Sequence, residues 1–177
     1  MSAETMSPPK GAKLWLMASR AYSFPASIIP VLFGSTLALI FDPAVKFNWL
    51  VFALTLVGSV LAQVGANLIN DIYDYKIGID KEDKKNGIPH GGSMVLSMNF
   101  MTLDQMKMGA TVALVIGSLI GFYLFLVAGP IVIYLTLFGV LSSIIYTATP
   151  AAFKYKALGD IQVFVSFGCV ITLGAYV

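Results

Sequence analysis

The stretch at residues 67–80 reads Asn67-Leu-Ile-Asn70-Asp71-Ile-Tyr-Asp74-Tyr-Lys-Ile-Gly78-Ile-Asp80 and ends a long apolar run. Helical spacing of i, i+3, i+4 and i+7 places its first two amides and first two carboxylates on one helix face. Asp80 falls on another face unless the helix stops earlier, and Gly78 is a candidate stop. Carboxylates at the end of an apolar helix repel one another, so we expect a divalent cation with oxygen ligands there.

The composition of the whole chain indicates an integral membrane protein. Of its 177 residues 58% are apolar and 11% are charged, and the mean hydropathy is +0.84. Soluble domains carry about 25% charged residues. The single cysteine, Cys169, excludes an internal disulfide. Residues 1–13 lack the short apolar core of a cleaved leader, so no signal peptide is expected.

Five apolar segments predict an all-α fold with five transmembrane helices. The first four are each close to the ~20 residues that cross a bilayer, and the fifth has 17. Between the second and third segments we expect one long polar loop, about residues 71–105. Near its end, Thr102 and Gln105 have the spacing of a helix-capping box. The five segments are residues 22–41, 47–70, 106–128, 130–148 and 161–177.

Positive charge lies almost entirely on one side of these segments. The side that holds the N-terminus, the long loop and the loop between the fourth and fifth segments has ten basic residues against one, Lys46, on the other. The positive-inside rule therefore predicts a multi-pass protein of the cytoplasmic membrane with a cytoplasmic N-terminus. The ten are Lys10, Lys13, Arg20, Lys76, Lys81, Lys84, Lys85, Lys107, Lys154 and Lys156.

Two further polar stretches lie on the same side. Gly91-Gly92-Ser93 offers backbone amides that suit a phosphate, although a single motif of this kind is a weak indication. The stretch from Tyr146 to Asp160 contains Lys154 and Lys156. These lysines have two interpretations that charge alone does not separate: ordinary flanking of a membrane helix, or an anion site beside the metal site.

The motif Asn70-Asp71-x-x-Asp74 resembles the first aspartate-rich motif of the UbiA-type intramembrane prenyltransferases. The longer form, through Gly78 to Asp80, is similar to the 1,4-dihydroxy-2-naphthoate polyprenyltransferase branch. Gly91-Gly92-Ser93-x-Val95-Leu96 and the stretch from Tyr146 to Asp160 are similar to that branch as well. The sequence departs from the family pattern at Gly78, where the family has a further aspartate, and at Asp160, where the branch usually has glutamate.

The resemblance implies that residues 1–177 form one partial transmembrane domain. Family members have about eight or nine membrane helices and a second aspartate-rich motif, so this chain corresponds to the first half of such a bundle. It fits a piece of a longer chain, one half of a split protein, or the product of a degenerate gene. The alternative function is a non-catalytic membrane subunit or inactive fragment. We expect the chain alone to be inactive and to need a C-terminal half as partner.

The same resemblance implies Mg²⁺-dependent transfer of a polyprenyl group from its diphosphate to an aromatic acceptor. The branch points to 1,4-dihydroxy-2-naphthoate and menaquinone biosynthesis. The lipid bilayer is the expected environment, and no nucleic-acid partner is expected. The implied metal ligands are Asp71, Asp74 and Asp80; the implied catalytic residues are Asp71, Asp74 and Lys154; the implied substrate-binding residues are Asn67, Asn70, Lys76 and Tyr146.

Overall fold

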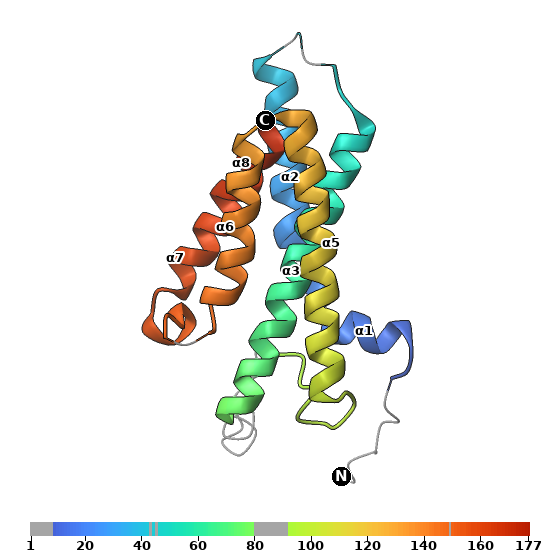
Figure 1. The fold of residues 1–177 in the computed structure, drawn as a ribbon, viewed down its shortest axis with the longest axis vertical. Coiled ribbons are helices and arrows are strands. Elements are labelled where there is room, and N and C mark those ends of the chain that lie inside the picture. The colour runs from blue at the N-terminus through green and yellow to red at the C-terminus, as the bar shows by residue number, and fades with distance from the viewer. Residues whose placement is uncertain (1–8, 43, 45, 80–91, 149) are drawn as a thin grey trace, which may run out of the picture.

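In the computed structural model, all the regular secondary structure of the described residues is helical (Figure 1). The model describes residues 9–42, 44, 46–79, 92–148 and 150–177. The elements are α1 (Ala12–Ala18), η1 (Ala21–Ser23), α2 (Pro25–Phe41), α3 (Trp49–Ile77), α5 (Leu103–Ala128), α6 (Ile131–Ile145), η2 (Phe153–Lys156), α7 (Gly159–Val163), η3 (Phe164–Ile171) and α8 (Thr172–Tyr176).

Four helical stretches among the described residues are long and apolar enough to cross a membrane, against the five predicted. They are Ala21–Phe41, Trp49–Ile77, Leu103–Ala128 and Gly159–Tyr176. Helix α6 has 15 residues and so covers only about 22 Å at 1.5 Å per residue, less than the ~30 Å of a hydrocarbon core. The prediction of five helices is confirmed, and that of five full-length spans is confirmed for four.

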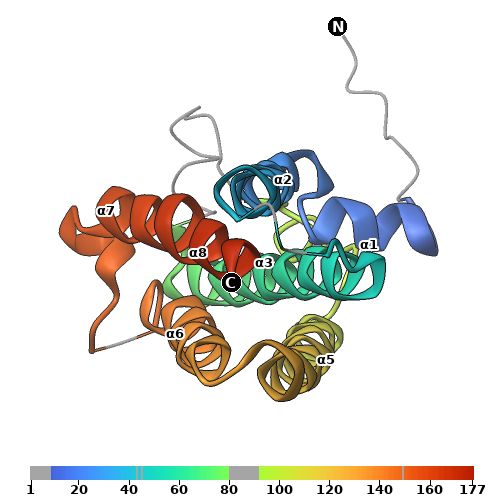
Figure 2. The same cartoon turned by 90° about the horizontal axis from the view of Figure 1, so that it is seen from above.

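Helix α3 lies at the centre of the bundle (Figure 2). It contacts α2, α5 and α6, and its packing against α5 is the most extensive in the structure. The last candidate span, Gly159–Tyr176, is the fifth of the predicted segments and is called the fifth span below. It is formed by α7, η3 and α8, and it packs along α2 through η3 and α8. The best-buried apolar cluster, which includes Leu68, Ile72, Val95 and Met106, lies at the end of the bundle where α3 finishes and α5 begins. The core therefore supports the polar end of α3 directly.

The polar motif is part of α3, which corrects the expected start of the loop at residue 71. The helix runs seven residues further, to Ile77, and ends at Gly78 with a φ of 85°. This left-handed conformation favours glycine because it has no Cβ. The predicted stop is thus confirmed. At the far side of the loop, Thr102 and Gln105 form the predicted capping box and α5 begins at Leu103.

The fifth span contains an unusual internal segment. Between the short α-helices α7 and α8, residues Phe164–Ile171 form the π-helix η3. π-Helical turns are rare and are often found at functional sites. Another feature not predicted is α1, a short helix before the first span. Its Trp15 ring packs against Gly109 of α5, which fixes the N-terminal segment beside the polar end of the bundle.

Candidate functional site

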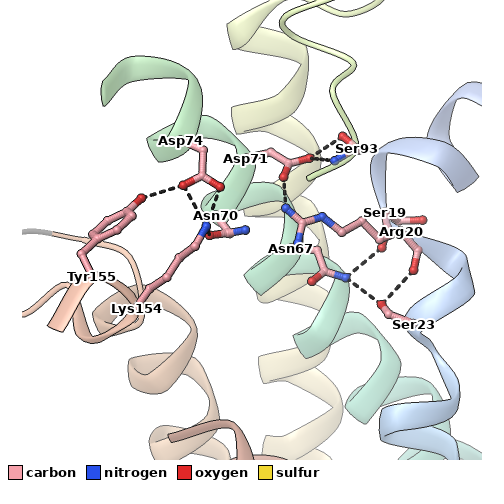
Figure 3. Close-up of polar contacts among 10 residues, drawn as sticks. All are labelled: Ser19, Arg20, Ser23, Asn67, Asn70, Asp71, Asp74, Ser93, Lys154 and Tyr155. Atoms are coloured by element: carbon pink, nitrogen blue, oxygen red, sulfur yellow. Dashed lines mark hydrogen bonds and ion pairs between the residues drawn. The ribbon is translucent and has the colours of Figure 1, made fainter. Parts of the chain in front are cut away.

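Asp74 and Asn70 face the segment that follows α6 (Figure 3). Lys154 Nζ donates to both carboxylate oxygens of Asp74, at 2.6 and 2.9 Å, and to Asn70 Oδ1 at 2.8 Å. The Tyr155 hydroxyl also donates to Asp74, at 2.7 Å. Asp74 and Asn70 are 4% and 5% exposed. The ammonium has three N–H donors, so all of them are engaged by this pair of α3 residues.

Asp71 faces the opposite direction, towards the N-terminal segment and the residues that follow the long loop (Figure 3). Its Oδ1 accepts from the Arg20 guanidinium in an ion pair. Its Oδ2 accepts from the Ser93 hydroxyl and, at 3.1 Å, from the Ser93 backbone N–H. Asp71 is 4% exposed. The two carboxylates are thus one helical turn apart and are neutralised by different basic residues.

Side-chain amides and hydroxyls form a series of hydrogen bonds that connects the start of α2, and the segment just before it, to α3. Asn67 Nδ2 donates to Ser19 O and Ser23 Oγ at 3.0 and 3.2 Å. Gln63 Nε2 donates to Ser23 O and Ser23 Oγ at 2.8 and 2.9 Å, and the Ser27 hydroxyl donates to Gln63 Oε1 at 2.6 Å. Asn67 is therefore a structural partner of the Arg20 segment in addition to lining the cavity described below.

Arg20 lies in strained backbone, and Lys154 lies between two strained residues. Arg20 itself has a left-handed conformation, with φ 55°. Ala152 and Ala157, on either side of the short helix that carries Lys154, have φ values of 42° and 57°. Non-glycine residues adopt this region infrequently, and such strain clusters at functional sites. The chain therefore turns sharply at both points where a basic side chain meets the motif.

A cavity of about 410 Å³ extends from these residues into the bundle. At its polar end lie Arg20, Asn67, Asn70, Tyr146 and Lys154; deeper, α3, α5, α6 and the fifth span line it with mostly small and apolar side chains. The cavity has the composition needed for a ligand with an anionic head and an apolar body. Asp71 and Asp74 lie beside the polar end but do not line the cavity.

The remaining predicted site residues are placed differently. Tyr146 lines the cavity, and burial together with the nearby Asp160 carboxylate raises the pKa of its phenol. Lys76 is exposed and lies outside the cavity, with its Nζ 5.5 Å from the centre of the Tyr73 ring. Asp80 lies outside the described residues.

The donor set of the motif fits Mg²⁺ in part. Asp71 and Asp74 supply carboxylates and Asn70 an amide oxygen, while Mg²⁺ keeps water and phosphate oxygens as its other ligands. Each carboxylate accepts three hydrogen bonds, out of about four lone-pair positions. Within the described ranges, no group of three or more His, Cys, Asp or Glu side chains could hold a metal ion.

Three residues of this arrangement were not predicted as site residues. Arg20 is the only arginine of the chain, and it lies just before the first apolar segment. This position could have identified it as a candidate site residue. Ser93 lies in the Gly-Gly-Ser stretch, which is a weak indication of a phosphate site, and in the structure it donates to Asp71. Tyr155 had no signal of its own beyond its place next to Lys154.

Comparison with known proteins matches the chain to one protein family. The model of the UbiA prenyltransferase family matches residues 27–177. The chain is 32% identical over 170 residues to a Drosophila melanogaster UbiA prenyltransferase domain-containing protein 1 homolog, covering 93% of this chain and 44% of that protein. It is 29% identical over 164 residues to the 1,4-dihydroxy-2-naphthoate octaprenyltransferase of Bacillus subtilis, covering 92% and 50%.

The Escherichia coli protein with the same octaprenyltransferase name is 30% identical over 171 residues, covering 92% of this chain and 52% of that protein. The chain therefore spans about half the length of the curated relatives it matches. No solved structure matches the chain.

Proposed function

Because the chain belongs to the UbiA prenyltransferase family, we propose that it forms the first half of an enzyme that transfers a polyprenyl group from polyprenyl diphosphate to an aromatic acceptor. Its partner is the remaining half of the bundle, in the same cytoplasmic membrane. The names of the Bacillus subtilis and Escherichia coli relatives favour 1,4-dihydroxy-2-naphthoate as the acceptor, and hence menaquinone biosynthesis.

One observation carries the proposal: Lys154 and Arg20 line the polar end of an otherwise apolar cavity. A prenyl diphosphate has an anionic head and a long apolar tail, and the cavity matches that division. The two cations bind diphosphate oxygens, while the apolar walls exclude water from the allylic carbon as its bond to oxygen breaks. Negative charge that builds on the leaving diphosphate is stabilised by the same cations.

The two carboxylates take a second role in this proposal. When Lys154 and Arg20 turn to the diphosphate, Asp74 and Asp71 lose the positive partners that they have in the structure. Asp71 and Asp74, with Asn70 beside them, are the residues that would hold Mg²⁺, and Asp80 is a further candidate. When bound, Mg²⁺ would supply additional positive charge for the leaving diphosphate.

The test is prenyl transfer by this chain reconstituted in nanodiscs with the C-terminal half of the Bacillus subtilis relative. Asp71→Ala and Asp74→Ala are expected to abolish turnover, and chelation of Mg²⁺ is expected to do the same. Asp104→Ala is the matched control, because Asp104 is an exposed acid of α5 whose ion-pair partner among the described residues is Lys107, also at the surface. Full turnover by both Asp71→Ala and Asp74→Ala would refute the proposed site.

The alternative, a non-catalytic subunit, is favoured by one feature: both carboxylates are already ion-paired within the chain. In that case the motif stabilises the fold and needs no ligand. The reconstitution separates the two proposals, since a structural subunit yields no product when it is combined with the C-terminal half of the relative. The chain without its partner half is expected to show no turnover, and product from the purified chain alone would contradict that expectation.

A further inference from the structure

The fifth span brings two polar atoms without partners into the cavity. Of the described residues, four have a buried side-chain nitrogen or oxygen with no hydrogen-bond partner: Arg20, Thr147, Gln162 and Ser166. All but Thr147 line the one cavity that contains the candidate site. An unpaired buried polar atom costs free energy. The presence of three such atoms along one cavity therefore indicates a ligand that supplies the missing partners.

Gln162 is held in a fixed orientation. Its Nε2 donates to the Ser142 carbonyl at 2.7 Å, and the same carbonyl accepts from the backbone N–H of Tyr146 at 3.0 Å. Because that contact requires the NH₂ group to face Ser142, the free atom is Oε1, which can only accept. The amide therefore lies within about one helical turn of the polar end of the cavity. Its Oε1 atom needs a hydrogen-bond donor.

Ser166 behaves differently from other hydroxyls on the membrane helices. Thr36, Thr55 and Ser143 each donate to the carbonyl four residues earlier, at 2.7–2.9 Å. Ser166 is in the π-helix η3, one turn beyond Gln162, and its hydroxyl is buried without a partner. The local change of helix type thus coincides with a hydroxyl that is left available to the cavity.

We propose that Gln162 and Ser166 are the contacts that recognise the hydroxyl groups of the aromatic acceptor. The proposal rests on the proposed function and deepens it. A ring hydroxyl donates to Gln162 Oε1, and a second ring oxygen accepts from Ser166 Oγ. The acceptor ring then lies directly below the diphosphate site defined by Lys154 and Arg20, where the allylic carbon must meet it. Apolar lipids and the prenyl tail lack the donor that Gln162 requires.

The test is equilibrium binding of 1,4-dihydroxy-2-naphthoate to the purified chain in nanodiscs, measured anaerobically by dialysis. Ser166→Ala and Gln162→Leu are each expected to weaken binding about fivefold, the effect of one lost hydrogen bond. Ser143→Ala is the matched control: its hydroxyl lines the same cavity but already donates to Gly139 O. This variant is expected to bind the naphthoate as the unchanged chain does.

Stability separates recognition from a structural role. Since Ser166→Ala removes an unpaired group, its unfolding temperature should be equal to or above that of the unchanged chain. The unchanged chain should also bind 1,4-dimethoxy-2-naphthoate, which cannot donate, about fivefold more weakly, and Gln162→Leu should remove this discrimination.

Unchanged naphthoate binding in both Ser166→Ala and Gln162→Leu would overturn the proposal and leave water as the partner of these atoms. Absence of naphthoate binding to the unchanged chain would overturn it too. Prenyl transfer that depends on Asp71 and Asp74 would remain possible in either case, so the two proposals fail separately.

Discussion

Asp74 shows how the polar end of α3 tolerates buried charge. The carboxylate is 4% exposed, and its partner Lys154 is the more accessible member of the pair, with 28% of its side chain exposed. A buried ion pair adds little compared with an apolar pair of the same shape, but removing one member leaves an uncompensated charge. The cost of a single substitution here is therefore large, and the cost of a double substitution is smaller.

We predict that Lys154→Met lowers the free energy of unfolding by about 3 kcal/mol, because Asp74 is left buried without its cation. The double variant Asp74→Asn with Lys154→Met should recover most of this loss. Lys156→Met is the control, since Lys156 is exposed and, among the described residues, donates to the Pro150 carbonyl and forms no ion pair. Thermal unfolding in detergent measures all of these variants. Additive losses in the double variant would show that the ion pair is not coupled.

The residues of the motif were predictable, and their partners were not. Helical periodicity alone placed Asn67, Asn70, Asp71 and Asp74 along one side of a helix end. Which cation meets which acid depends on tertiary contacts: Arg20 is 51 positions from Asp71 and Lys154 is 80 from Asp74. The four side chains form two i, i+4 pairs that face different neighbours (Figure 3). Asn67 and Asp71 face the N-terminal segment, while Asn70 and Asp74 face Lys154.

At the scale of whole elements, local signals predicted helix ends better than the hydropathy pattern did. Gly78 and the Thr102–Gln105 box mark the observed boundaries, because backbone conformation and capping act within a few residues. The apolar run stops at residue 70, yet α3 continues because its polar side chains find partners on other segments. The π-helix η3 had no signal in hydropathy.

Close helix packing at Gly34 gives a prediction for α2 and α8. A Cβ added at Gly34 would lie 2.2 Å from the Thr172 carbonyl oxygen and 2.9 Å from Ala175 Cβ. Because backbone cannot yield as a side chain does, Gly34→Ala should cost about 2 kcal/mol of stability. Gly139→Ala, in α6, meets nothing within 4 Å and should gain up to about 1 kcal/mol from helix propensity. Equal unfolding temperatures for the two variants would contradict this packing.

For the molecule as a whole, the candidate chemistry is gathered at one end of the bundle. The start of α2, the end of α3 and the segment after α6 meet there (Figure 1). The end of α2 and the start of α3, between which Lys46 lies in the sequence, are at the opposite end (Figure 1). For the proposed substrate, a prenyl diphosphate, a site at one membrane surface would let the charged head stay near water while the tail enters the apolar cavity.

This charge distribution predicts the orientation of the chain in a cell membrane. Moving basic loops across the bilayer is unfavourable, so the end with Lys107 and Lys154 should face the cytoplasm. In a Cys169→Ser background, a membrane-impermeant maleimide should label Lys46→Cys in intact cells. Asp104→Cys, at the exposed start of α5, should be labelled only after the cells are opened. The reverse pattern would place the candidate site outside the cell, where the proposed substrate, a cytoplasmic prenyl diphosphate, could not reach Lys154.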